Sequence, residues 1–121
     1  MRTVLDTNAI LYLLGGRVAE SLAVGEYFVS VISEMELLSY PLLDASEQTK
    51  IREFLSDVTV VGLTEDVKDR AIALRLTHQL KLPDAIVAAT ALSLEGLLIT
   101  NDVRLLRIPK LRSQPLKLKD V

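Results

Sequence analysis

Residues 82–92 read Leu-Pro-Asp-Ala-Ile-Val-Ala-Ala-Thr-Ala-Leu, a run that is apolar or small after one carboxylate. Proline suits a first helical turn, where its missing N–H is not needed, so the pattern predicts a helix beginning at Pro83. A helix this apolar on every side belongs in the protein interior. Asp84 would then lie in the first turn of a buried helix, where the helix dipole favours an anion and can direct it into a cleft.

Working outward from this run, short β-type segments alternate with helical patterns along the chain. Strands are predicted at residues 3–5, 27–30, 58–61 and 97–99, with an edge strand at 116–118. Helices are predicted at 9–14, 18–24, 34–40, 47–55 and 103–107, and from 65 and 83 onward. No tight hairpin signal separates the strands. The alternation therefore predicts an α/β protein with a parallel sheet and helices on both of its faces.

Length and composition favour a single domain over residues 1–121. No apolar run approaches the eighteen residues of a membrane helix, and the first residues carry no signal-peptide pattern, so we expect a cytoplasmic protein. The chain has no cysteine and one histidine, His78. A bound metal would thus be a hard cation held by oxygen atoms. His78 continues an apolar helix face, which favours a packed, hydrogen-bonded histidine over a catalytic one.

Four acidic residues, Asp6, Glu36, Asp84 and Asp102, follow the predicted strands or open the buried helix. In an open parallel sheet the functional cleft lies beyond the carboxyl ends of the strands, so we expect all four there, as loop or first-turn residues. Crowded carboxylates repel one another and raise each other's pKa unless a cation neutralises them. Mg²⁺ suits such a cluster, and two ions could activate a water for phosphodiester hydrolysis.

Each acid also has a structural interpretation. Asp6 and Asp102 could be helix N-caps, Glu36 could complete a capping box with Ser33, and Asp84 could interact with a helix dipole. Neighbouring polar side chains could orient the carboxylates or a nucleophilic water, and these candidates are Thr7, Asn8, Ser33, Thr100 and Asn101.

Charge is distributed unevenly. Residues 1–98 carry eight basic and fourteen acidic side chains, whereas residues 99–121 carry six basic and two acidic ones. A basic segment could hold a phosphate backbone near the carboxylates, or it could be a solvated terminal segment. The candidate residues for binding such a backbone are Arg104, Arg107, Lys110 and Arg112.

Four motifs together resemble PIN-domain ribonucleases, and especially the VapC-type toxins of prokaryotic toxin–antitoxin pairs. They are Val-Leu-Asp-Thr-Asn at 4–8, Ser-Val-Ile-Ser-x-x-Glu-Leu at 30–37, Leu-Pro-Asp-Ala-x-x-Ala-Ala-x-Ala at 82–91 and Leu-Ile-Thr-x-Asp at 98–102. The resemblance implies an α/β/α sandwich with a short, mostly parallel sheet of four to five strands. It also implies an endoribonuclease dependent on one or two Mg²⁺ or Mn²⁺ ions, which Asp6, Glu36, Asp84 and Asp102 would bind.

The same resemblance implies a homodimer and a cognate antitoxin that covers a groove near the site. Ala9–Leu14 and the residues Leu37, Leu38, Tyr40 and Leu42 could supply an apolar surface for such partners, although core packing also explains them. Leu105 departs from the family pattern, because many members carry an acidic or polar residue there.

Two other functions remain open at this stage. A phosphotransfer protein would use a lone acceptor such as Asp6 with a nearby lysine, for which Lys81 is the candidate. A catalytically degenerate PIN-like domain would bind RNA or protein without cutting, and Leu105 keeps that alternative open.

Overall fold

The computed structural model describes residues 2–120, and its centre is a five-stranded sheet. The strands are β1 (Arg2–Leu5), β2 (Glu26–Ser30), β3 (Thr59–Val61), β4 (Leu97–Ile99) and β5 (Ser113–Gln114). They are arranged in the order β3-β2-β1-β4-β5, and every pair of neighbours is parallel. The predicted parallel sheet is thus confirmed. The chain leaves β1 toward β2 and β3, then crosses back to build β4 and β5, so strand order reverses between β1 and β4.

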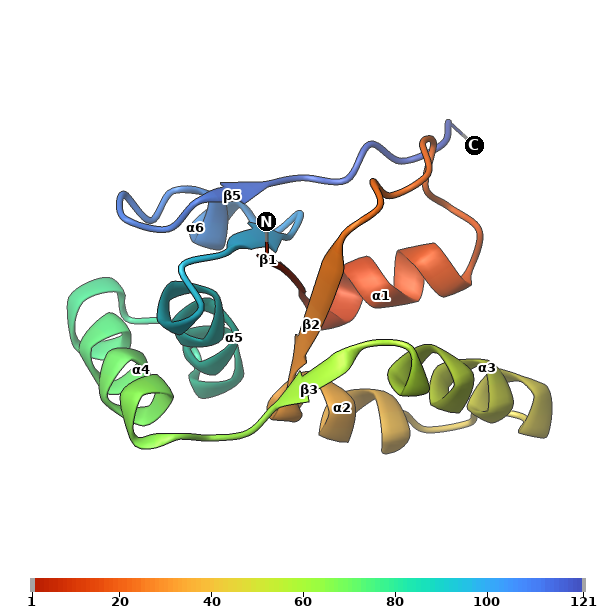
Figure 1. Cartoon of the computed structure of the whole chain (residues 1–121), viewed down its shortest axis with the longest axis horizontal. Helices are drawn as coiled ribbons and strands as arrows, with labels where there is room; N and C mark the ends of the chain where they lie inside the picture. Colours follow the sequence, from red (N-terminus) through yellow and green to blue (C-terminus); the bar gives the residue numbers. More distant parts are fainter. Residues whose placement is uncertain (1, 121) are drawn as a thin grey trace.

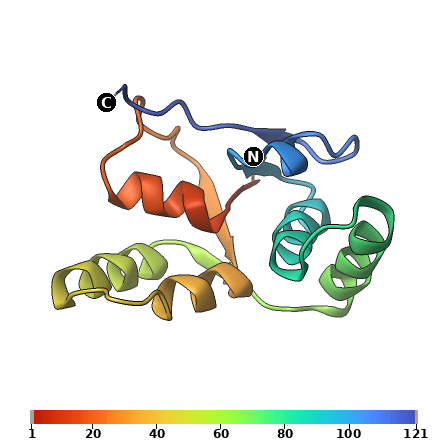
Figure 2. The ribbon, with the colours of Figure 1, turned by 180° about the vertical axis from the view of Figure 1, so that it is seen from behind.

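Helices cover both faces of this sheet. Helices α1 (Thr7–Leu14) and α3 (Ala45–Ser56) lie on one side, and α4 (Glu65–His78) and α5 (Leu82–Ser93) lie on the other, as Figure 1 shows and Figure 2 shows from behind. Two further helices follow strands: α2 (Val31–Leu38) directly follows β2, and α6 (Val103–Leu106) begins shortly after β4. The predicted α/β fold with three layers is therefore confirmed. None of the helices in residues 2–120 is long and apolar enough to cross a membrane.

Period-two alternation along the strands divides the core between the two faces. Val4 packs into the cluster beneath α4 and α5, and its neighbour Leu5 packs into the cluster beneath α1 and α3. Leu98 and Ile99 divide in the same way on the adjacent strand. Successive side chains of a strand point to opposite faces, and both faces of this sheet are covered, so consecutive residues such as Val4 and Leu5 or Leu98 and Ile99 are all apolar and buried.

Helix α5 is the interior helix that its composition predicted. Seven consecutive residues, Ala85–Ala91, are buried, so the helix has no solvated face over two turns. The one polar side chain among them, Thr90, donates its hydroxyl to the Ile86 carbonyl at 2.8 Å, which satisfies it without another partner. Small side chains let α5 pack closely between α4 and the sheet.

Two predictions near the chain's edge are wrong. Residues 18–24 form no helix, and the fifth strand lies at Ser113–Gln114 and not at 116–118. Instead, Val18 forms an isolated antiparallel bridge with Leu118, and the Ala19 and Lys119 amides donate to the Lys117 and Arg17 carbonyls at 2.8 Å. Backbone pairing between distant segments replaces the local helical bonds that the pattern suggested.

Helix α2, predicted at residues 34–40, also begins earlier than predicted. Ser30 is the N-cap of α2, and its hydroxyl accepts from the Ile32 amide at 3.2 Å, so the helix covers 31–38 and not 34–40. Ser33 therefore lies inside the helix, and the capping box predicted for Ser33 and Glu36 is wrong. A capping box does occur in α3, where Asp44 and Glu47 each bond to the other's backbone amide.

His78 is exposed, so its predicted packing in the core is wrong. Helix α4 ends at Gln79, whose φ of 54° lies in the left-handed region. After this reversal Leu80 is 4% exposed and packs in the core cluster, whereas His78 does not.

Substitution of Gly96 by alanine should destabilise the fold by about 1–3 kcal/mol, because a Cβ there would lie 2.8 Å from the Arg2 carbonyl oxygen. Gly62→Ala is the matched control, since a Cβ at Gly62 meets no atom within 4 Å. Urea denaturation of both variants provides the measurement. Equal stability of the two proteins would show that the approach of Gly96 to β1 is not a tight constraint.

Candidate active site

Four carboxylates from four elements line one open pocket of about 340 Å³. Asp6 is the N-cap of α1 directly after β1, and Asp102 is the N-cap of α6 shortly after β4. Asp84 lies in the first turn of α5. Glu36 was expected in a loop or first turn, but it lies in the second turn of α2. The pocket is therefore at the carboxyl ends of the strands, beside the reversal of strand order between β1 and β4.

Asp6 is the most buried of these acids, at 8% exposure. Its Oδ1 accepts a hydrogen bond from the Ala9 amide at 2.7 Å, which is the capping contact of α1. Burial raises the pKa of Asp6, and the charges of Asp102 and Asp84 raise it further, while hydrogen bonds from the Thr100 side chain and the Ala9 amide oppose the rise. Asp6 thus carries negative charge in a place where water stabilises it poorly.

Thr100 connects two of the carboxylates. Its side chain is fully buried, and its hydroxyl hydrogen-bonds to Asp6 while accepting from the Asp102 amide at 3.1 Å. Asp102 Oδ1 in turn accepts from the Arg104 amide at 2.9 Å. One buried hydroxyl therefore orients a carboxylate after β1 and the loop after β4 together.

Glu36 accepts a hydrogen bond from the first turn of α1. The Thr7 hydroxyl donates to Glu36 Oε1 at 2.7 Å and contacts Ser33 Oγ at 2.9 Å. A hydroxyl carries one hydrogen, so Ser33 is the donor in the second contact. Asn8, the next residue in the turn, lines the pocket. Of the polar side chains proposed to orient the carboxylates, Thr7 and Asn8 line the pocket, and Ser33 hydrogen-bonds to Thr7.

Asp84 faces Asp102 across a shared arginine. Burial and the Asp102 charge raise the pKa of Asp84, and the Arg104 guanidinium lowers it. Arg104 Nη2 lies 3.5 Å from Asp84 Oδ2 and 3.3 Å from Asp102 Oδ2. The sequence suggested Arg104 only as an RNA contact, although its place two residues after Asp102 in a short helix is a local signal for such a pair.

Oxygen donors of this kind suit a hard divalent cation, and the pKa increases at Asp6 and Asp84 indicate negative charge that is not fully compensated. As the side chains stand, no three acidic or histidine side chains in residues 2–120 are grouped closely enough to hold an ion. Thr7 hydrogen-bonds to Glu36, and Arg104 contacts both Asp84 and Asp102. The residues fit a magnesium-like ion in type.

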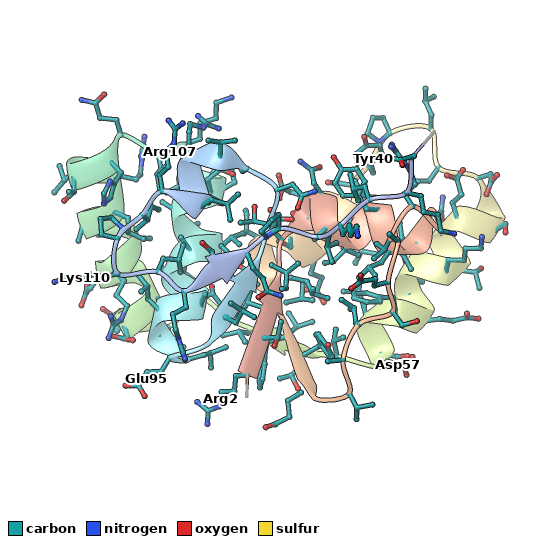
Figure 3. The ribbon with its side chains drawn as sticks, turned by 90° about the horizontal axis from the view of Figure 1, so that it is seen from above. Arg2, Tyr40, Asp57, Glu95, Arg107 and Lys110 are labelled. Atoms are coloured by element: carbon teal, nitrogen blue, oxygen red, sulfur yellow. The ribbon has the colours of Figure 1, made fainter. Side chains whose placement is uncertain are left out.

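Three other predicted residues lie elsewhere. Asn101 does not line the pocket; its amide pairs with the Leu116 backbone, accepting at 2.7 Å and donating at 3.3 Å. Arg112 donates to the Glu95 carbonyl, at the opposite end of the sheet from the pocket. In Figure 3, Arg107 and the pocket residue Tyr40 lie toward one end of the sheet, and Arg2 and Glu95 lie toward the other. Lys110 is exposed beside α4.

Leu105 is both a wall of the pocket and a core residue. It is 2% exposed and belongs to the cluster beneath α4 and α5. A carboxylate there would be buried unless α6 shifted, so the position favours an apolar side chain. Leu11 and Tyr40, which the sequence suggested as apolar surface near the site, also line the pocket. The other apolar or uncharged wall residues were not predicted, and they are Ser39, Pro41, Pro83 and Val87.

A parallel α/β/α sandwich with an acidic pocket at its topological reversal defines a class of proteins that bind ligands beyond the strand ends. The family model for the PIN domain matches residues 3–111, and the chain belongs to the PIN domain family. No curated protein matches the sequence. The motifs quoted above had already indicated this family.

Solved structures agree with the family assignment. A toxin–antitoxin complex from Klebsiella pneumoniae has 30% identity and a TM-score of 0.77, covering 90% of this chain and 94% of the other. VapBC-1 from nontypeable Haemophilus influenzae has 26% identity and a TM-score of 0.76, covering 95% and 98%. VapBC2 from Rickettsia felis, bound to a DNA fragment from their promoter, has 21% identity and a TM-score of 0.82, covering 97% and 100%.

Replacement of Asp6 by asparagine should stabilise the metal-free protein at neutral pH. Burial raises the pKa of Asp6, so the folded protein holds a proton there more tightly than the unfolded chain, and ionisation costs folding free energy. Asparagine keeps the N-cap without the charge. The melting temperature in EDTA should be higher for Asp6→Asn, by a margin that opens as the pH rises above 3.8, the ordinary value.

Asp69→Asn, on the exposed surface of α4, is the control and should change little at any pH. A lower melting temperature for Asp6→Asn at pH 7 would contradict the assignment of uncompensated charge to this carboxylate.

Proposed function

We propose that this protein is a metal-dependent endoribonuclease that cleaves RNA phosphodiester bonds. The observation that carries the proposal is the gathering of Asp6, Glu36, Asp84 and Asp102 around one pocket of a PIN domain. Such a group suits divalent-ion binding. A phosphotransfer protein would need a lysine beside its acceptor carboxylate, and the candidate Lys81 does not line the pocket.

In this proposal the four carboxylates would hold Mg²⁺ or Mn²⁺, one or two ions. A bound ion would supply Lewis acidity and lower the pKa of a water. The chain's own residues position the ligands: Thr7 orients Glu36, and Thr100 orients Asp6. Leu11, Val87 and Leu105 line the pocket with apolar surface, which limits water around the charged groups.

We propose further that the protein acts in the cytoplasm as the toxin of a toxin–antitoxin pair. Support comes from the neighbours, which are toxin–antitoxin complexes by name. An antitoxin would need an accessible apolar surface near the pocket, and Met35, Leu38, Tyr40 and Leu42 are exposed on α2 and the segment after it. Leu37 does not contribute, because it is fully buried, and Ala9 and Ile10 are also core residues.

A homodimer is part of the same proposal. Ile72 and Leu76 of α4 and Leu82 at the start of α5 are exposed by 52%, 81% and 50%, and they share one shallow pocket. Apolar side chains grouped in this way would be suited to covering by a second copy.

Glu36→Gln should lower Mn²⁺-dependent RNA cleavage by about 100-fold or more without unfolding the protein, because it removes a charged ligand from an exposed position. Asp84→Asn should have the same effect. Glu34→Gln is the matched control, since Glu34 lies in the same helix but does not line the pocket. The assay follows a fluorescent RNA with Mn²⁺ or EDTA. Cleavage by Asp84→Asn at the wild-type rate would refute the nuclease assignment.

RNA binding should depend on the basic residues at the pocket end of the sheet. In a Glu36→Gln background that does not cut, Arg107→Gln should weaken binding of a single-stranded RNA and reduce its salt slope by about 0.7. Arg112→Gln should leave the slope unchanged, because this side chain bonds to the Glu95 carbonyl at the other end. Fluorescence anisotropy at several salt concentrations gives both slopes. Equal salt slopes of RNA binding for the two variants would show that RNA does not contact Arg107.

A further inference from the structure

Arg104 places a positive charge at the rim of the acidic pocket. One nitrogen, Nη2, lies 3.5 Å from Asp84 Oδ2 and 3.3 Å from Asp102 Oδ2, so a single cationic atom contacts two of the four carboxylates. The other two ion pairs in residues 2–120, Lys68–Glu65 and Arg70–Asp66, are local pairs on α4, and their residues do not line the pocket. Arg104 is therefore the chain's own counter-ion for this group of acids.

Asp102 is bound by Arg104 at both of its oxygens. The Arg104 amide donates to Oδ1 at 2.9 Å, and the guanidinium contacts Oδ2 at 3.3 Å. The hydrogen bond from the amide is the N-cap contact of α6 and persists as long as that helix does. The guanidinium contact is separable, because the Arg104 side chain is 57% exposed and can rotate into solvent. Exposed ion pairs of this kind are weak and exchange readily.

We propose that Arg104 is an internal counter-ion that a divalent metal must displace, so that this residue sets the metal affinity of the pocket. The inference rests on the proposed function, since it assumes that the carboxylates bind a divalent ion. An ion that binds the Oδ2 atoms of Asp84 and Asp102 would meet the guanidinium charge, and the two cations would compete for the same oxygens.

The competition gives Arg104 two positions with different partners. Without metal, it offsets repulsion between Asp84 and Asp102. With metal, it is released at the pocket mouth, where its charge faces the phosphate backbone of a bound RNA. Arg104 is in this account a positioning residue and not a metal ligand.

Removal of the Arg104 charge should therefore tighten metal binding. Titration calorimetry with Mn²⁺ alone, at low ionic strength, should give a Kd for Arg104→Gln about three- to tenfold lower than for the wild type. The gain should shrink as salt is added, because salt screens the repulsion. Arg104→Lys keeps the charge and should stay within about twofold of the wild type.

Arg107→Gln is the matched control, because Arg107 is an exposed arginine three residues further along that pairs with no carboxylate in residues 2–120. Circular dichroism checks that each variant is folded. Unchanged or weaker Mn²⁺ binding by Arg104→Gln would overturn the inference while leaving the proposed metal site in place. If neither the wild type nor Arg104→Gln binds Mn²⁺, the proposed function fails and the inference fails with it.

Discussion

Mutual repulsion among the carboxylates at one end of the sheet is the constraint on which the rest of the structure depends. The fold gives each acid a stabilising partner. Asp6 and Asp102 accept from backbone amides at the starts of α1 and α6, Glu36 accepts from Thr7, and Asp84 lies near the positive end of the α5 dipole. These interactions hold the negative charge in place without removing it, as the raised pKa values of Asp6 and Asp84 indicate.

Sheet topology explains why these acids meet although they are far apart in sequence. All strands are parallel, so the segments after β1, β2 and β4 emerge at the same edge. Helix α5 brings Asp84 to that edge because the helix is buried along its length and its first turn ends at the pocket. Core packing and site geometry are thus coupled. A displacement of α5 large enough to relax the core would also move a carboxylate.

The pocket is not purely acidic, because Arg104 lies at its rim and contacts two of the four carboxylates. Arg104 neutralises part of the negative charge of Asp84 and Asp102, which its guanidinium contacts at 3.5 and 3.3 Å. Leu105, the next residue, is committed to the core. Helix α6 therefore presents a cation toward the site and an apolar side chain toward the interior, within one turn.

The sequence by itself determined the features that depend on local chemistry: the apolar helix that includes residues 85–91, the alternation of strands and helices, and the carboxylates at helix starts. Tertiary structure decided the rest. Val18 pairs with Leu118, and Arg112 bonds to the Glu95 carbonyl away from the pocket, so both depend on a partner distant in sequence. Leu80 is buried and His78 is not, because of the direction that the chain takes after α4. Short-range periodicity carries no information about such contacts, because their free energy comes from surfaces that meet only in the folded chain.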